Sequence, residues 1–171
     1  RTPHRGSAVF GVDPKLISRA KKGLYGEIIS DEYMRRKGYA QLLPEGRYAR
    51  SLEDVPKGRG LDGVYENPRH LQPPKYTITE TKYREGGRYI DSDGSASDSA
   101  LSMTKNSGRQ MSSTWIQSNL IREFQGNSQF LLRDIQKEGY ISLLMIVDET
   151  GKVVAISKLN SAGRTIQGIR P

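Results

Sequence analysis

The chain has 171 residues, of which 35% are hydrophobic, and it carries a formal net charge of +8 at pH 7. This length fits a single domain, and the basic balance favours a polyanionic partner through steering and counterion release. The chain has no cysteine, which excludes disulfides and thiolate metal sites. It has only two histidines, so few residues are available for a zinc cluster or a Ser-His-Asp triad. Any metal is therefore expected to be a hard cation held by carboxylates.

The first part of the chain predicts a linker followed by a helix. Residues 1–12 contain proline and glycine without periodicity, so we expect a linker there and a single domain over 13–171. Asp13 and Pro14 form a typical helix start, and apolar side chains recur at helical spacing as far as the stop at Gly38. No apolar run approaches the ~20 residues of a membrane span, and no signal peptide is apparent, so we expect a soluble protein.

Two strands are predicted after a polar connection over 39–60. The segments 61–66 (LDGVYE) and 75–83 (KYTITETKY) favour strands, and the turn-rich loop between them predicts an antiparallel pair. The second segment alternates, which places Glu80 and Lys82 on one face with Ile78.

The second half of the chain predicts two helices and a hairpin. Residues 84–109 are rich in glycine, serine and aspartate, and a region of this length without periodicity is usually functional or disordered. Helices are expected from about 112 to 125 and from 130 to 137, and two strands flank the turn signal at 148–151. The order of elements predicts an α/β (α+β) fold with a central mixed β-sheet flanked by helices.

The polar residues on the first two strands suggest a chemistry. If the strands pair, the carboxylates of Asp62 and Glu80 and the ammonium of Lys82 meet at one place. Phosphodiester cleavage uses this set, because carboxylates hold Mg²⁺ or Mn²⁺ and a lysine offsets charge on the phosphorus centre. Taken singly, each residue has an ordinary interpretation: Asp62 as a turn residue, and Glu80 with Lys82 as an ion pair on an exposed edge strand.

Three segments in this order carry a family resemblance: GLDGVY at 60–65, YTITETKY at 76–83 and GRQMSSTWI at 108–116. Over roughly 15–125 the chain resembles the restriction-endonuclease-like, PD-(D/E)xK nuclease domains found at the C-termini of bacterial polymorphic toxins. The resemblance implies a metal-dependent nuclease, most often acting on DNA. It also implies delivery domains preceding this chain, secretion from the producing bacterium, action in the cytoplasm of a rival cell, and a cognate immunity protein.

The resemblance also assigns roles to individual residues. Asp62 matches the metal-binding aspartate, Glu80 the second acidic ligand and Lys82 the motif lysine. Gln110 matches the polar residue expected near the scissile phosphate or the attacking water. One departure from the pattern is Leu61, which stands where the motif proline is found.

A helix carboxylate is also expected to contribute to the metal site. Glu27 resembles this residue, although Asp31 or Glu32 could fill the same place.

Several interpretations stay open at the level of sequence. A ribonuclease with the same site and a non-catalytic basic nucleic-acid-binding module are the alternatives to a DNA nuclease. Trp115 is expected to pack its helix against the sheet rather than to stack on a base. The basic residues around 19–22 and 35–37 are expected to form solvated helix faces unless they line the same cleft as Glu80.

Overall fold

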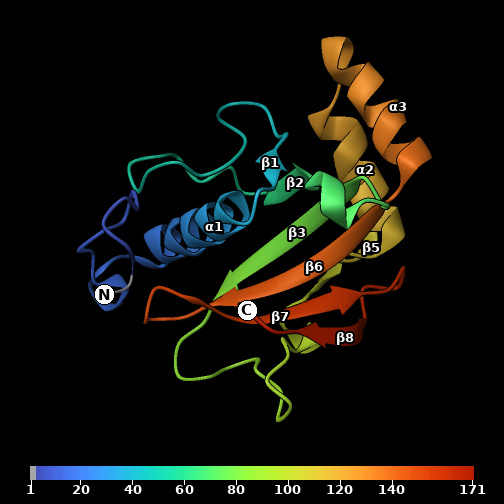
Figure 1. The fold of residues 1–171 in the computed structure, drawn as a ribbon. Helices are drawn as coiled ribbons and strands as arrows, with labels where there is room; N and C mark the ends of the chain where they lie inside the picture. Colours follow the sequence, from blue (N-terminus) through green and yellow to red (C-terminus); the bar gives the residue numbers. More distant parts are fainter. Residues whose placement is uncertain (1–2) are drawn as a thin grey trace.

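A computed structural model describes residues 3–171, and its centre is a mixed six-stranded sheet with the order β1-β2-β3-β6-β7-β8 (Figure 1). Only β3 and β6 run parallel, and every other neighbouring pair is antiparallel. The predicted α+β architecture with a mixed sheet is confirmed, as are both predicted strand pairs. The strands of this sheet are β1 Ala40–Gln41, β2 Gly63–Glu66, β3 Tyr76–Tyr83, β6 Tyr140–Val147, β7 Val153–Leu159 and β8 Thr165–Ile169.

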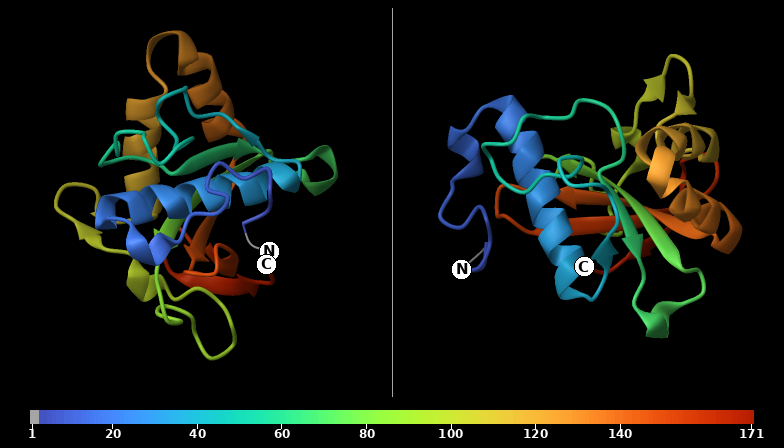
Figure 2. Two further views of the ribbon diagram at one scale, coloured as in Figure 1. Left: turned by 90° about the vertical axis from the view of Figure 1, so that its left-hand side faces the viewer. Right: turned by 90° about the horizontal axis from the view of Figure 1, so that it is seen from above.

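Helices cover both faces of the sheet. Helix α1 (Arg19–Arg36) crosses one face, while α2 (Ser113–Glu123) and α3 (Gln129–Glu138) lie on the other (Figures 1 and 2). Along β6, Leu143 and Met145 pack in the cluster under α1, whereas Leu144 and Ile146 pack in the cluster under α2. Among the described residues, no helix combines the length and apolar character that a membrane crossing requires.

Strand β3 is central rather than peripheral. It pairs with β2 on one side and β6 on the other, and seven of its eight residues are buried. Even Thr77 and Thr79 are 0% and 1% exposed. The interpretation of Glu80 and Lys82 as an ion pair on an exposed edge strand is therefore wrong.

The first helix differs from the prediction of one continuous helix from residue 13. Asp13 caps only a short 3-10 turn over Pro14–Leu16, and Ile17 is extended. The Ser18 side chain then caps a new helix by accepting from the backbone N–H of Lys21 at 3.3 Å. A serine is a strong N-cap, and here it outweighs the aspartate–proline start that precedes it.

The segment before this helix is also folded. Residues 3–12, expected to be part of a linker, form a run of turns, and Val9 is fully buried in the cluster under α1. The backbone N–H of Ala8 donates to the Glu32 carboxylate at 2.8 Å. This contact joins the segment to α1.

The long region at 84–109 is a structured insert, which we call the 84–109 insert. It contains a 3-10 turn at Asp98–Ala100 and a small hairpin made of β4 (Met103–Thr104) and β5 (Gly108–Arg109). Ala96 and Leu101 anchor it in the core under α2. In Figure 2 the β4–β5 hairpin projects beyond the sheet on the same side as the N-terminal end of α1.

Candidate active site

The sheet opens at a defined point, and Asp62 lies there. Strand β2 begins opposite Thr79, so the second half of β3 has no β2 partner on that side. Asp62 immediately precedes β2, and its carboxylate accepts the backbone N–H of Thr81 at 2.9 Å. The Asp62 side chain thus satisfies a backbone donor that the missing strand leaves free. The Asp62 carboxylate also lies beside Glu80, as the predicted pairing of the two strands requires.

The carboxylate of Glu80 lies at the base of this opening. Its side chain is buried, and Oε2 is 3.3 Å from the Lys82 ammonium and accepts from the Gln110 amide nitrogen at 3.0 Å. Oε1 is buried and has no hydrogen-bond partner among residues 3–171. Burial, and then the charge of Asp62, raise the pKa of Glu80 well above its ordinary value, while Lys82 opposes this shift. Leaving a buried carboxylate oxygen without a partner is costly unless something else binds it.

These oxygens suit a hard divalent cation. Within residues 3–171, no group of three or more acidic or histidine side chains is arranged to hold a metal ion. Mg²⁺, however, is usually held by one or two carboxylates and keeps several waters. Asp62 and the unpartnered oxygen of Glu80 are such donors, and a cation beside them would offset both the burial and the repulsion from Asp62 that raise the pKa of Glu80. The residues present therefore fit the metal that the sequence predicts.

Glu27 is the helix carboxylate that faces this cleft. It lines the same cavity as Asp62 and Glu80. Burial, and then the Asp62 charge, raise the pKa of Glu27 to about 8, while Lys57 and Lys82 lower it. The effect of the Asp62 charge on Glu27 shows that the two side chains lie close enough to interact electrostatically across the cleft.

The two alternative helix carboxylates have structural partners instead. Asp31 accepts from the Tyr65 hydroxyl at 2.7 Å and from Arg35 Nε at 2.7 Å. Glu32 binds the N-terminal segment. Neither of them lines the cleft.

The raised pKa of Glu27 gives a stability prediction. A carboxyl whose pKa is higher in the folded state favours folding at low pH, and this contribution is lost as the pH rises towards about 8. In metal-free buffer, Glu27→Gln should therefore raise the Tm relative to the parent at pH 8 and leave it nearly unchanged at pH 5. Thermal melting at both values tests this, with Glu138→Gln on the exposed end of α3 as the control. An equal effect of Glu27→Gln at both pH values would contradict the assignment.

The cleft around these residues is large and basic. It encloses about 1090 Å³ between the start of α1, the 58–60 segment, the end of β3, the β4–β5 hairpin and α2. Cationic side chains outnumber carboxylates along it, and besides Lys82 they are Arg19, Lys22, Arg59, Arg84, Arg88, Lys105 and Arg122. Of the basic residues in α1, Arg19 and Lys22 thus line the cleft. Lys21 instead pairs with Glu53, and Arg35 with Asp31.

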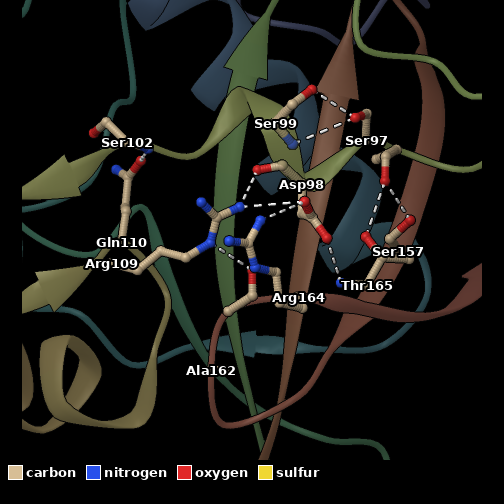
Figure 3. Close-up of polar contacts among 12 residues, drawn as sticks. Ser97, Asp98, Ser99, Ser102, Arg109, Gln110, Ser157, Ala162, Arg164 and Thr165 are labelled. Atoms are coloured by element: carbon tan, nitrogen blue, oxygen red, sulfur yellow. Dashed lines mark hydrogen bonds and ion pairs between the residues drawn. The ribbon is translucent and has the colours of Figure 1, made fainter.

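Gln110 is positioned by an anchor that the sequence did not indicate. It directly follows Arg109, which donates to the carbonyl of Gly163 at 3.1 Å and forms an ion pair with Asp98 at 3.3 Å (Figure 3). Asp98 also accepts the backbone N–H of Thr165 at 2.8 Å. These contacts tie the 84–109 insert to the β7–β8 turn and fix the backbone at Gln110. The partners are far apart in sequence, so no local pattern connects them.

Trp115 serves as core, as expected from the sequence. It is 7% exposed and belongs to the hydrophobic cluster under α2, although one side of it lines the cleft.

Comparison with protein-family models, curated proteins and solved structures finds no match to this chain.

Proposed function

We propose that this chain is a metal-dependent nuclease with a restriction-endonuclease-like, PD-(D/E)xK site. The observation that carries the proposal is the buried Glu80 carboxylate, which has one oxygen without a partner among the described residues. It lies beside Asp62 and Lys82 at the base of a basic cleft. In a purely structural ion pair both carboxylate oxygens would be expected to have hydrogen-bond partners. A carboxylate that binds a metal ion instead leaves one oxygen available to coordinate it.

Each residue has a distinct role in this proposal. Asp62 and Glu80 would hold Mg²⁺ or Mn²⁺, with Glu27 as a further oxygen donor once it is ionised. When bound, such an ion supplies Lewis-acid polarisation and lowers the pKa of a coordinated water. The Lys82 ammonium provides a fixed positive charge where negative charge builds up on the phosphate. Gln110 holds Glu80 with one amide hydrogen, which leaves its second hydrogen to donate to the substrate.

The basic cleft supports nucleic acid as the substrate, and we propose DNA. A purely nucleic-acid-binding module is less consistent with the site, because a buried carboxylate repels phosphate and destabilises the fold while adding nothing to binding. A ribonuclease with the same site is distinguished by offering both substrates.

The direct test is plasmid cleavage with purified protein. We expect linear or fragmented DNA in Mg²⁺, intact DNA in EDTA, and intact DNA with a Glu80→Gln variant in Mg²⁺. Retarded migration without shortening would instead indicate a binding module, and degradation of RNA alone would reassign the substrate. Cleavage that persists in EDTA would overturn the metal-dependent mechanism.

The motif resemblance further supports a role as an antibacterial toxin domain. We propose that the chain is secreted by its producing bacterium, acts in the cytoplasm of a target cell, and is carried there by delivery domains. Its cognate immunity protein should be acidic where it binds, because the cleft that it must block is basic. Co-expression with proteins encoded beside it, followed by size-exclusion chromatography, tests for such a partner. If no neighbour forms a complex, the toxin role loses its support although the nuclease chemistry can stand.

A further inference from the structure

Two arginines that line the cleft are held against a single tyrosine ring just after β3. The guanidinium carbon of Arg84 lies 5.3 Å from the ring centre of Tyr89, and that of Arg88 lies 5.2 Å from it. Stacking of this kind restrains a guanidinium while leaving its N–H groups available to a ligand. The aromatic ring therefore serves both arginines as one platform.

The tyrosine itself is held in place. Tyr89 packs, partly buried, against the core cluster under α2. Its φ of 63° is uncommon for a residue with a side chain, and the backbone N–H of Ser97 donates to its carbonyl at 2.8 Å. Sparsely populated backbone conformations of this kind occur often at ligand-binding segments. The platform is thus part of the folded insert and not a freely moving surface side chain.

Neither arginine is neutralised by the protein. Within residues 3–171 no carboxylate forms an ion pair with Arg84 or Arg88. The nearest acid in sequence, Glu85, is engaged elsewhere: its carboxylate lies 2.9 Å from the Lys22 ammonium and accepts from the Tyr83 hydroxyl at 2.8 Å. One N–H of Arg84 donates to the carbonyl of Tyr83 at 2.7 Å, and one of Arg88 donates to the Tyr89 hydroxyl at 3.4 Å. Both guanidinium groups therefore line the cleft with their charge and their remaining N–H groups available.

Their position relative to Glu80 defines what they could bind. The N–H of Arg84 still donates to the carbonyl of Val147 at 2.9 Å, so the alternation of β3 continues and Arg84 shares a face with Glu80 and Lys82. Four residues of strand span about 13 Å between backbone positions. We therefore assign to Arg84 a phosphate other than the one at Glu80.

We infer that Arg84 and Arg88, stacked on Tyr89, form a subsite for a backbone phosphate that flanks the scissile one. The guanidinium fork matches the geometry of phosphate oxygens, so two preoriented forks favour a phosphodiester over a carboxylate or a neutral ligand. The inference rests on the proposed function in taking nucleic acid as the ligand. It also gives the 84–109 insert a role, because this insert supplies the platform and both arginines.

The test measures binding without cleavage. A fluorescent DNA duplex is titrated by anisotropy at several salt concentrations, using the Glu80→Gln protein as the parent. Losing one phosphate contact reduces the steepness of the plot of log association constant against log salt concentration by about 0.9. We expect the Arg84→Ala/Arg88→Ala double variant to show this loss. The matched control, Arg133→Ala, removes an exposed positive charge on α3 outside the cleft and should leave the slope unchanged.

A second pair of variants isolates the platform. Tyr89→Phe keeps the ring and loses only the long 3.4 Å contact between its hydroxyl and Arg88, so it should retain most of the parent's binding. Tyr89→Leu keeps both charges but removes the ring, and it should weaken binding severalfold. Thermal melting confirms that each variant is folded. Equal binding by the two Tyr89 variants, a double variant with the parent slope, or no DNA binding by the parent would each overturn the subsite.

The two proposals can fail separately. If the wild-type chain cleaves no nucleic acid in Mg²⁺ while the slopes change as expected, the subsite is supported and the nuclease assignment fails. If cleavage requires Glu80 and Lys82 while the slopes do not change, the nuclease assignment is supported and the subsite fails.

Discussion

Replacing Lys82 with alanine is expected to lower DNA cleavage by about 10²–10³-fold, the usual effect of removing a preorganised charge-stabilising group. The Lys82 ammonium lies 3.3 Å from Glu80 Oε2, at the base of the cleft. In the proposed reaction its loss would remove positive charge where negative charge develops on the phosphate. Additional Mg²⁺ should not restore the rate, because the two carboxylates that would hold the ion remain in place.

The same variant should change the pH dependence of whatever activity is left. Lys82 lowers the pKa of Glu80, so its removal raises that pKa further above the ordinary value. A higher pH is then needed to ionise the carboxylate, and the residual rate should rise at higher pH than the parent rate does. Initial rates on plasmid DNA across a pH series measure both effects.

The control for this experiment is Lys152→Ala, which removes an exposed charge from the turn between β6 and β7, outside the cleft. It should reduce cleavage only slightly, through weaker general attraction to DNA. Thermal melting establishes that both variants fold. A folded Lys82→Ala protein that degrades DNA at the parent rate would refute the assigned mechanism.

Much of the site geometry was predictable because it depends on local rules. A turn-rich loop between two strand-forming segments predicts a hairpin, and the hairpin brings Asp62 next to Glu80. Alternation along β3 predicts that Glu80 and Lys82 share a face, and the ion pair between them agrees with this. The predicted helices over 112–125 and 130–137 correspond to α2 and α3, within two residues at each end.

Other features depend on contacts that no local pattern encodes. The 84–109 insert lacks periodicity, and its order comes from Asp98, which binds Arg109 and the N–H of Thr165. Strand β8 was missed because it is a largely exposed edge strand without an apolar alternation. The choice among the helix carboxylates required the structure, because only the packing of α1 shows that Glu27 faces the cleft while Asp31 bonds to Tyr65.

Close packing within the protein explains two glycines that weaken or strain the backbone. A Cβ at Gly26 in α1 would lie 3.2 Å from the Cβ of Tyr83, so glycine lets the helix pack closely on β3. At Gly60, where φ is 126°, a Cβ would lie 2.7 Å from the Glu123 carboxylate. Glu123 also pairs with Arg47, which donates to the carbonyl of Arg59 at 3.2 Å. Close approach to the protein itself, rather than to a ligand, therefore accounts for Gly60.

Asp62→Asn should have a different signature from Lys82→Ala, namely a loss of activity that excess metal partly restores. In the proposed site the variant would lose a charged ligand. The Mg²⁺ concentration for half-maximal cleavage should then rise by at least the 10–100-fold that is typical of losing even an outer partner of a metal site. The fold should be preserved, because an asparagine oxygen can still accept the N–H of Thr81 that Asp62 accepts at 2.9 Å. Asp62→Ala would instead leave that donor unsatisfied and destabilise the protein by about 1–3 kcal/mol.

The physical reason for rescue lies in the coupling between the carboxylates. Burial, and then the charge of Asp62, raise the pKa of both Glu80 and Glu27, so removing that charge lowers both pKa values and makes these groups easier to ionise. The remaining carboxylates then offer charged oxygens to the ion at high metal concentration. Cleavage rates in a Mg²⁺ titration of the parent, Asp62→Asn and Lys82→Ala proteins separate the two roles. If Asp62→Asn follows the parent curve, or if Lys82→Ala recovers while Asp62→Asn does not, Asp62 is not a metal ligand.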